Sequence, residues 1–556
     1  MQRASSTVVR CLILGMMLLL AACQSEEPRV EPPTVATETI AVAETTLTDP
    51  APEATATRAA TETAPPATPT SAPQELAENM TLVGSLPLEP AGRGAHADVA
   101  AYEDLAIVGS RCTGAGVHII DISDPTDPEK LANTPESPNT SMEDMQVLRI
   151  GEQDVLVIGF QNCANPDDED QGLEGIELVD ITTPARPRHL SLFATSGGVH
   201  ELDLAETPDG RALALLAIPQ EHEEGDGEES HSQAEEGGQA GLVIVDISDP
   251  RKPTLASQWD ILDEPTLGEA VQENSAQGSF PIAYLHSVRA NEDGTLAYLS
   301  YWDAGVILLD ISAPESPRYL SRTTFTEEDE GNAHSVTEAA DGQVMVQAQE
   351  DFSPYRLHVS SSALDAQVPL IELGLGTEIK EFPDATLAGE AVHGGRGCFE
   401  DEPLVDADGK IVLVAQGGGC AMSEKIAVAQ EAGAIAVILY EEEDGEETVE
   451  EEGPPRDGVT LPDGTRVTLE IPVLLSLSAG SKRLLEAAPL ELTIESRFDG
   501  FGDLRFYDIS DSNNPRLLGS FASPNTRDEA VAELGVWSAH NPEVVGDTLY
   551  ASWYSE

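Results

Sequence analysis

Five histidines occur at one repeated position in this chain, each at the start of a short strand-like segment. They lie in the sequences Ala95-His96-Ala97, Val199-His200-Glu201, Leu285-His286-Ser287, Ala333-His334-Ser335 and Ala539-His540-Asn541. Neutral imidazoles gathered around one point are good ligands for copper, iron or zinc. If the repeated position faces a common axis, these side chains predict a site for a transition metal or a small ligand.

The same pattern also has a purely structural interpretation. A histidine at a repeated position can hold its own unit together by hydrogen bonding to the backbone or to a nearby aspartate. One unit departs from the pattern, because it has Met142-Glu143-Asp144 at this place. The sequence leaves both interpretations open.

A second repeated motif supplies the elements that must position these histidines. An apolar strand ending in Asp-Ile-Ser or Asp-Ile-Thr recurs five times, with its aspartate at Asp121, Asp180, Asp246, Asp310 and Asp508. Continuous Val, Ile and Leu suit a strand that is buried on both faces. The aspartate can accept hydrogen bonds from the turn that follows it. A hairpin before the motif and one strand after it give four strands per unit, which is the blade of a β-propeller.

These units resemble the LVIVD-repeat family over roughly residues 80–355 and 500–556. The resemblance implies a mainly β fold, a β-propeller of about six blades, in which the first strand of each blade is innermost. His96, His200, His286, His334 and His540 would then converge on the central channel. The resemblance implies a fold and no particular activity.

The motif spacing predicts an insertion. The first four copies follow at intervals of 59, 66 and 64 residues, but 198 residues separate Asp310 from Asp508. The extra segment reads as strand, glycine-rich loop, helix and strand, over 411–440, with a further strand at 471–476. It resembles a protease-associated (PA) domain, a small α/β module that binds peptides or shapes access to a neighbouring site without being catalytic.

Peptidase motifs are absent from the sequence. There is no H-E-x-x-H and no G-x-S-x-G, and His200-Glu201 lacks the second histidine of a zinc motif. The glycine-rich loop contains neither Gly-Lys-Ser/Thr nor G-x-G-x-x-G, the two sequence fingerprints of nucleotide binding. We therefore expect a binding or interaction module for a peptide, protein or glycan. The alternative is a metal-dependent oxidase or hydrolase that uses the histidines.

The first 23 residues predict export. Arg3 and Arg10 flank a short apolar stretch that is too short to span a bilayer, and it ends in Leu20-Ala21-Ala22-Cys23. This ending resembles a bacterial lipobox, which implies that Cys23 carries the lipid and anchors the protein to a membrane. An ordinary secretory signal is the alternative. Residues 24–78 are rich in Pro, Thr, Ala and Glu and predict a disordered stalk.

The charge of the chain excludes one class of partner. Acidic residues number 100 against 29 basic ones, for a formal net charge of −71. Nucleic-acid binding requires a basic face, so we expect none. The acidic loops at 165–170 and 221–236 do not match a calcium-binding loop, and we interpret them as solvated surface.

Four cysteines remain after the signal segment and Cys23. In an oxidising compartment an even number favours disulfides, and three pairings are possible. Cys112 and Cys163 precede the motif strand at corresponding positions of the first two units, which favours a bridge between neighbouring blades. Cys398 and Cys420 then pair, and the resemblance to PA domains also implies this pair.

The predicted order of domains is a signal segment (1–23), a stalk (24–78), propeller blades (79–358), a PA insertion (359–498) and the rest of the propeller (499–556). Residues 80–86 look like an outer strand that partly closes the ring. The last unit has only two recognisable strands, so we expect that the gene continues beyond this sequence.

Overall fold

The computed structural model describes residues 81–92, 94–164, 171–219, 241–264, 267, 284–326, 329, 331–364, 368–399, 404, 406–417, 420–440, 459–462, 464–476 and 478–555. The predicted signal segment, Cys23, the stalk and both acidic loops lie outside these residues.

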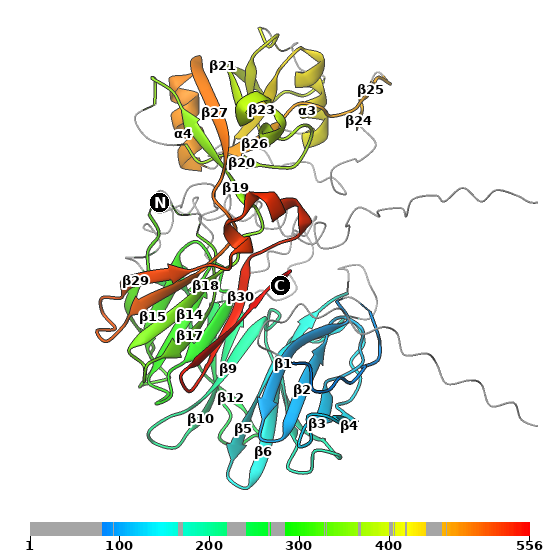
Figure 1. Ribbon diagram of the computed structural model, residues 1–556, viewed down its shortest axis with the longest axis vertical. Helices are drawn as coiled ribbons and strands as arrows, with labels where there is room; N and C mark the ends of the chain where they lie inside the picture. Colours follow the sequence, from blue (N-terminus) through cyan, green and yellow to red (C-terminus); the bar gives the residue numbers. More distant parts are fainter. Residues whose placement is uncertain are drawn as a thin grey trace, which may run out of the picture.

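Four blades are consecutive four-stranded antiparallel sheets (Figure 1). Blade 1 contains β1 (His96–Tyr102), β2 (Leu105–Ser110), β3 (His118–Asp121) and β4 (Glu129–Asn133). Blade 2 contains β5 (Thr140–Ile150), β6 (Gln153–Asn162), β7 (Gly175–Asp180) and β8 (Arg188–Ala194). Blade 3 contains β9 (Glu201–Glu206), β10 (Ala212–Ile218), β11 (Gly241–Asp246) and β12 (Thr254–Trp259). Blade 4 contains β13 (Ser287–Ala290), β14 (Leu296–Tyr301), β15 (Gly305–Asp310) and β16 (Arg318–Arg322).

The fifth blade is split by the insertion, as the motif spacing predicted. Its sheet order is β17-β18-β28-β29, so the chain leaves after the second strand and returns at the third. The last sheet described has two strands. These elements are β17 (Ala333–Ala339), β18 (Val344–Gln349), β28 (Leu504–Asp508), β29 (Arg516–Phe521), β30 (Ala539–Val545) and β31 (Thr548–Trp553).

The third strand of each complete blade is the predicted motif strand. Its aspartate accepts a hydrogen bond from the backbone N–H two residues later in all five copies, for example Ser123 N to Asp121 Oδ1 at 2.9 Å and Thr182 N to Asp180 Oδ1 at 3.0 Å. The apolar residues of these strands are buried on both faces, as in β15. Each buried Ile or Leu side chain contributes roughly 1.5–3 kcal/mol.

The hydrophobic core consists of separate clusters, each of which lies between two neighbouring blades. One buried cluster joins blades 1 and 2, a second joins blades 2 and 3, and a third joins blades 3 and 4. Two smaller clusters join blades 4 and 5 and blades 5 and 6. The innermost strands also contact one another in order, from β1 through β5, β9, β13 and β17 to β30. This arrangement brings the starts of all six innermost strands to one end of the channel.

Two disulfides confirm the predicted pairing. Cys112 bonds to Cys163 and so links blade 1 to blade 2. Cys398 bonds to Cys420 within the inserted domain. Disulfides of this kind are typical of an extracytoplasmic environment.

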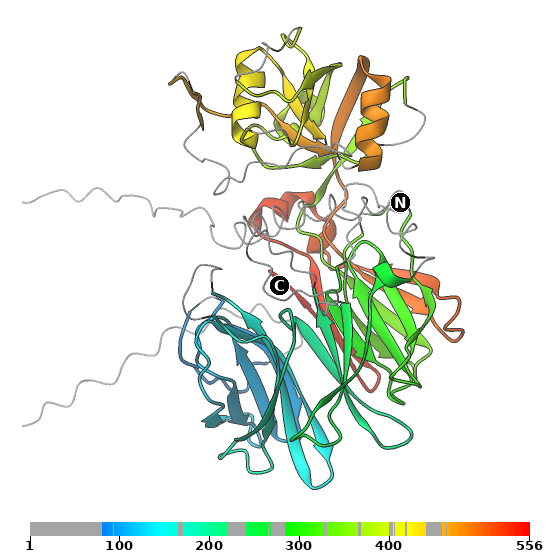
Figure 2. The same ribbon diagram turned by 180° about the vertical axis from the view of Figure 1, so that it is seen from behind.

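The insertion forms a separate α/β domain above the propeller (Figures 1 and 2). Its seven-stranded sheet has the order β19-β27-β21-β22-β23-β26-β20, and β21, β22, β23 and β26 run parallel. The first strand, β19, starts at Tyr355, slightly before the predicted boundary at 359. The strands are β19 (Tyr355–Ser360), β20 (Ile371–Glu372), β21 (Thr386–Gly395), β22 (Ile411–Ala415), β23 (Ala436–Tyr440), β24 (Val459–Thr460), β25 (Arg466–Val467), β26 (Val473–Ser476) and β27 (Leu490–Phe498). The helices are α3 (Met422–Glu431) and α4 (Ser478–Ala487).

Short 3-10 helices complete the list of elements. They are η1 (Ile261–Asp263), η2 (Ile379–Glu381), η3 (Pro383–Ala385), η4 (Asn525–Arg527) and η5 (Glu529–Leu534). Two of them, η4 and η5, lie between β29 and β30, on the side of the propeller that faces the inserted domain (Figure 1). The described helices include none with the length and hydropathy of a membrane span.

The predicted outer strand before blade 1 is not formed. Residues 81–90 carry no strand in the structure. Gly84 nevertheless packs so closely on Pro125 that a Cβ there would collide with the Pro125 carbonyl oxygen. In blades 2 and 3 the outer-strand residues Ser191 and Ser257 donate to the carbonyl oxygens of Pro250 and Pro314 in the next blade. The segment around Gly84 therefore takes an outer position beside blade 1, but without the ladder partner that would make it a strand.

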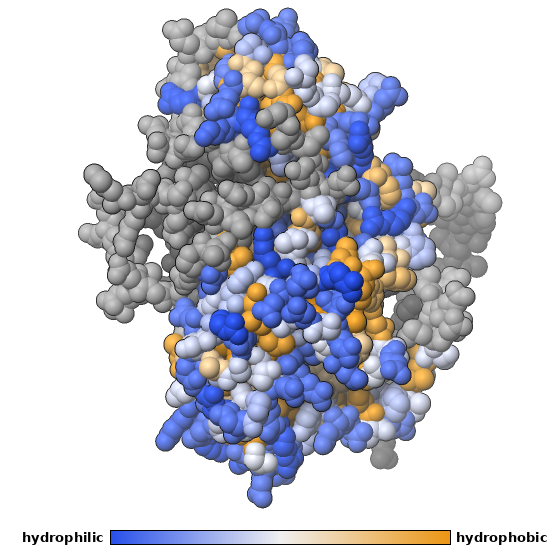
Figure 3. Space-filling model, turned by 90° about the vertical axis from the view of Figure 1, so that its left-hand side faces the viewer, coloured by the Kyte–Doolittle hydropathy of each residue, from blue (hydrophilic) through white to orange (hydrophobic). Residues whose placement is uncertain are grey.

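The face of the molecule shown in Figure 3 is mainly hydrophilic, with apolar side chains in small patches. This agrees with the excess of acidic over basic residues, 100 against 29.

Candidate metal centre in the propeller channel

Four of the five predicted histidines come together in the structure. The Nε2 atoms of His200 and His286 lie 2.9 Å apart. The ring of His286 lies 3.8 Å from that of His334, measured between centroids, and the His334 and His540 rings are 4.4 Å apart. Each residue comes from a different blade, and each lies at or just before the start of its innermost strand, β9, β13, β17 or β30.

A buried carboxylate completes this group. Glu350 follows β18 and is only 6% exposed. Its Oε2 lies 3.5 Å from His334 Nε2, and its Oε1 lies 3.7 Å from His540 Nε2. Potential ligand atoms of His286, His334 and Glu350 all lie within 4.8 Å of one another. We call His200, His286, His334, His540 and Glu350 the channel site.

The residues around the channel site come from the ends of the second strands. Antiparallel pairing places the end of a second strand beside the start of the first, as in the pair Ser287 and Ser300. Gln161 contacts His200 at 3.1 Å from Nε2 to Nδ1, and Trp302 packs against the rings of both His286 and His334. Trp302 has a φ of 33°, a strained conformation for a large side chain, and such strain is often found at functional sites.

Tyr554, just after β31, forms the outer side of the channel site. Its hydroxyl donates a hydrogen bond to Glu350 Oε1, and its ring lies edge-on to His540, with 4.9 Å between centroids. Because Tyr554 is 43% exposed, it lies between the buried carboxylate and solvent.

Burial controls the charge of these groups. It lowers the pKa of His200, and it lowers the pKa values of His286 and His334 well below the usual value. Burial also lowers the pKa of His540, to about 4, and raises the pKa of Glu350 to about 7. The four imidazoles are therefore neutral near pH 7, with lone pairs available for a Lewis acid.

The donor set fits a transition-metal ion. Two imidazole nitrogens bound cis to one ion at about 2.0–2.1 Å are roughly 2.9–3.4 Å apart, and the His200–His286 distance falls in this range. Imidazoles with one carboxylate suit zinc, copper or iron. In addition, His286 Nδ1 is buried without a hydrogen-bond partner, and its closest acid is Glu201, whose Oε1 lies 3.8 Å away.

His96 does not join the other four histidines. Its ring lies edge-on to His118 of the same blade, with 5.4 Å between centroids, and its Nδ1 is buried without a hydrogen bond. No ring contact or hydrogen bond of His96 with His200, His286, His334 or His540 is present among the described residues. Blade 2 contributes Glu143 in place of a histidine, as the sequence indicated.

Glu350, Tyr554 and Trp302 were not predicted from the sequence. The signal that could have found them is the pairing rule itself, since a residue that ends a second strand must lie near the histidine of its own blade. Applied to β18, β31 and β14, the rule identifies these three residues.

Deeper in the channel, carboxylates connect neighbouring blades. Asp144 Oδ2 accepts a hydrogen bond from Leu202 N, and Asp203 Oδ2 accepts one from Ala290 N, both at 2.7 Å. Burial raises the pKa of Asp144 to about 7 and also raises that of Asp203. These acids have a clear structural role, because each holds its blade to the next.

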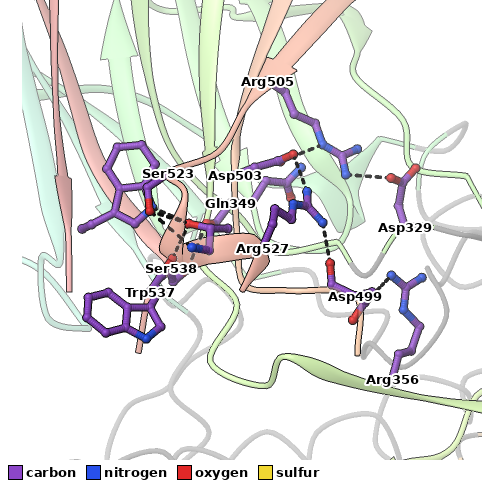
Figure 4. Close-up of polar contacts among 12 residues, drawn as sticks. Asp329, Gln349, Arg356, Asp499, Asp503, Arg505, Ser523, Arg527, Trp537 and Ser538 are labelled. Atoms are coloured by element: carbon purple, nitrogen blue, oxygen red, sulfur yellow. Dashed lines mark hydrogen bonds and ion pairs between the residues drawn. The ribbon is translucent and has the colours of Figure 1, made fainter. Parts of the chain in front are cut away.

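The inserted domain is fixed to the propeller by an ionic network at the two chain crossings (Figure 4). Arg505 pairs with Asp329 at 2.6 Å, Arg527 pairs with Asp503 at 3.0 Å, and Arg356 pairs with Asp499. Together with Gln349 and Asp351, they line a cavity of about 150 Å³. Tyr284 adds a second link, because it packs on the core of the inserted domain and also contacts the rings of His286 and Trp302.

Family models match two parts of this chain. The LVIVD repeat model matches residues 93–133, 237–260 and 293–324, and the PA domain model matches residues 384–469. None of the curated proteins gives a significant match.

Solved structures resemble the chain only in part. A zinc aminopeptidase from Bacillus subtilis is 22% identical, with a TM-score of 0.18, and the match covers 30% of this chain and 36% of the aminopeptidase. The β-propeller domain of Cps50 (Swd1) from Myceliophteria thermophila is 12% identical, with a TM-score of 0.29, over 49% of this chain and 67% of that one. A GH43 β-xylosidase/α-arabinofuranosidase from a compost microbial metagenome is 12% identical, with a TM-score of 0.27, over 46% of this chain and 85% of that one. This chain thus covers about a third of the aminopeptidase, and similarities this low carry no functional argument. With its four-stranded blades, its inserted α/β domain and both family matches, the chain contains LVIVD repeats in a β-propeller and a PA domain inserted in blade 5.

Proposed function

We propose that this protein is an extracytoplasmic lipoprotein whose propeller channel binds a transition-metal ion. His286, His334 and Glu350 are the central ligands, and His200 and His540 complete the set. The observation that carries the proposal is the convergence of four imidazoles, from four blades, on one buried carboxylate.

A structural role for the histidines explains this arrangement less well. Neutral imidazoles and a carboxylate are costly to bury unless their polar atoms have partners. At the centre of the site the closest partner of His200 Nε2 is another imidazole nitrogen, and His286 Nδ1 has no hydrogen bond. A bound cation would give the inward-facing nitrogens a common partner and would compensate the charge of Glu350.

The identity of the bound metal would determine which reaction the channel site supports. Copper or iron would support oxidation, and zinc would support hydrolysis by lowering the pKa of a bound water. In either case the propeller holds the ligands rigidly, because each one begins or ends a strand of a packed blade.

The test is elemental analysis of the purified protein, together with titration by Zn²⁺ and Cu²⁺. We expect one ion per chain in the wild type and at least a tenfold loss of affinity in His286→Ala and His334→Ala. His189→Ala is the matched control, because His189 is a half-exposed histidine on the outer strand β8. If the wild type binds no transition metal, or if the three variants behave alike, the metal site is wrong.

The lipid anchor is tested separately. We expect the wild type to partition with membranes or detergent, and Cys23→Ser to be released in soluble form. Equal partitioning of the two proteins would argue against lipidation of Cys23.

A second candidate function is an interaction module for a peptide, protein or glycan. The PA domain favours it, because this domain is placed on the same side of the propeller as the channel site and contacts the site through Tyr284. Binding of such a ligand by wild-type protein that contains no metal would support this function over the first.

A further inference from the structure

The channel site is one-sided. Blades 3, 4, 5 and 6 each supply a histidine, whereas blades 1 and 2 supply none. Blade 2 has Glu143 at that position, and Glu143 forms an ion pair with Arg111, the residue that follows β2 in blade 1. Arg111 of blade 1 and Glu143 of blade 2 therefore form an ion pair on the side of the channel where no histidine joins the site.

Glu143 lies on β5 of blade 2, which contacts β9 of blade 3. Its neighbour Asp144 accepts a hydrogen bond from Leu202 N, and Gln161 of the same blade contacts His200 Nδ1. Both carboxylate oxygens of Glu143 have partners, since Ser141 Oγ donates to Oε2 at 2.6 Å and Arg111 pairs with Oε1. Glu143 thus holds Arg111 toward the histidines while its own charge is compensated.

Arg111 retains unused hydrogen-bonding capacity. Its side chain is 46% exposed, and Glu143 is its ion-pair partner among the described residues. A guanidinium has five N–H donors in a planar fork.

The backbone fixes Arg111 in this position. Its N–H donates to Ala95 O at 3.1 Å, next to His96. Cys112 follows immediately, has a φ of 43°, and is bonded to Cys163 of blade 2. A residue held on both sides in this way binds a ligand with little loss of conformational freedom.

We propose that Arg111 is the anion-binding residue of the channel site, and that the ligand reaching the metal carries a carboxylate. Arginine recognises a carboxylate through two parallel hydrogen bonds, which lysine cannot reproduce. The ligand would approach from the side of blades 1 and 2, where no imidazole blocks the ion. This inference rests on the metal-binding function proposed above.

The experiment uses protein loaded with Co²⁺, whose visible absorption changes when a ligand enters its coordination sphere. Acetate is the probe, and acetamide is the neutral probe of the same shape. We expect acetate, but not acetamide, to change the spectrum of the wild type. In Arg111→Gln we expect acetate to bind about 10- to 100-fold more weakly, while Co²⁺ is retained. Arg149→Gln is the matched control, because Arg149 is an exposed arginine of blade 2 that pairs with Asp154, and it should behave as the wild type.

A second variant, Glu143→Gln, keeps the proposal testable if Arg111→Gln does not fold. Glu143→Gln removes the competing carboxylate, so acetate should bind several-fold more tightly than in the wild type. If Co²⁺ binds but acetate affinity is unchanged in Arg111→Gln, or does not rise in Glu143→Gln, the role of Arg111 is wrong and the metal site stands. If Co²⁺ does not bind to the wild type, the proposed function itself fails, and this inference fails with it.

Discussion

The Nε2 atom of His200 lies 2.9 Å from that of His286, although 86 positions separate the two residues in the chain. Neither residue can reach the other through local structure, because each belongs to its own blade. The contact exists only once blades 3 and 4 have packed through their shared core. The channel site is therefore a product of the assembled propeller and not of any single repeat.

Tyr554 should increase the metal affinity of the channel site without being a ligand. Tyr554→Phe removes the hydrogen bond to Glu350, so the carboxylate loses the donor that orients it. Loss of such an outer partner typically costs 10- to 100-fold in metal affinity. We expect a loss of about tenfold, measured by competition with a chelator of known affinity.

The matched control for Tyr554 is Tyr550→Phe on β31, the strand that Tyr554 follows, because Tyr550 is 58% exposed. This variant should retain the wild-type affinity. Equal affinity in all three proteins would show that the hydrogen bond to Glu350 is irrelevant to the site.

The motif aspartates should make the propeller sensitive to acid. Hydrogen bonds from Ser123, Ser312 and Ser510 lower the pKa values of Asp121, Asp310 and Asp508, the last to about 2. A folded-state pKa below the unfolded value means that the unfolded chain binds more protons in acid. The stabilisation is complete above about pH 4 and is lost as the pH falls to about 2. Chemical denaturation at several pH values should show this decrease.

Asp180 offers a sharper test of the same motif. Burial alone would raise its pKa, but hydrogen bonds from Thr182, Gln153 and Arg188 bring it to about 2. Asp180→Asn removes the charge that faces Arg188 and places an amide donor in a buried, donor-rich site. We expect a loss of roughly 1–3 kcal/mol in the free energy of unfolding. Asp121→Asn is the control, since Asp121 is less buried than Asp180 and has no arginine partner in the described structure; a loss equal to that of Asp180→Asn would contradict the argument.

The two disulfides should stabilise different parts of the molecule. Cys112 and Cys163 close a loop with a sequence separation of 51, and Cys398 and Cys420 close one of 22. The loop-entropy model gives about 4 and about 3 kcal/mol for these lengths. We expect the double Ser variant at 112 and 163 to lower the melting temperature of the propeller. The variant at 398 and 420 should lower that of the PA domain, with calorimetry resolving the two transitions. A single transition shifted equally by both variants would show that the two domains unfold together.

Arg505 should be essential to the junction between the domains. It lies largely buried between Asp329 and Asp503 and above the ring of Phe325. Arg505→Ala leaves Asp329, whose side chain is 20% exposed, without this cation, while Asp503 keeps its pair with Arg527, and we expect a loss of about 3 kcal/mol. Arg497→Ala removes an exposed pair with Glu495 and should cost well under 1 kcal/mol. Denaturant titration distinguishes the two, and similar losses would contradict a special role for the junction.

The fold was largely predictable from the sequence because its determinants are local. The Asp-Ile-Ser strand carries its own turn signal, and the gap between Asp310 and Asp508 revealed the insertion. The pairing of Cys112 with Cys163 followed from equal positions in neighbouring repeats. The outer strand before blade 1 was predicted wrongly, because strand-like residues such as those around Gly84 need a ladder partner that the motif does not supply.

The site was predicted only in part because its determinants are not local in the sequence. The repeat pattern identifies histidines at one position, but it cannot show that the His96 ring faces His118 instead of the channel site. Glu350 belongs to no motif, and its importance depends on one contact within blade 5, to His334, and one contact across blades, to His540. The second contact depends on how blades 5 and 6 pack, which is not encoded in any one repeat.

The place of the PA domain within blade 5 has a further consequence. Strands β18 and β28 pair in register from Val344 and Asp508 to Ala348 and Leu504, as continuously as the second and third strands of the other blades. The hydrogen-bonded ladder therefore does not depend on what lies between the two strands. The domain occupies the position of a hairpin loop between β18 and β28, so exchanging it for another module should leave the register of the propeller unchanged.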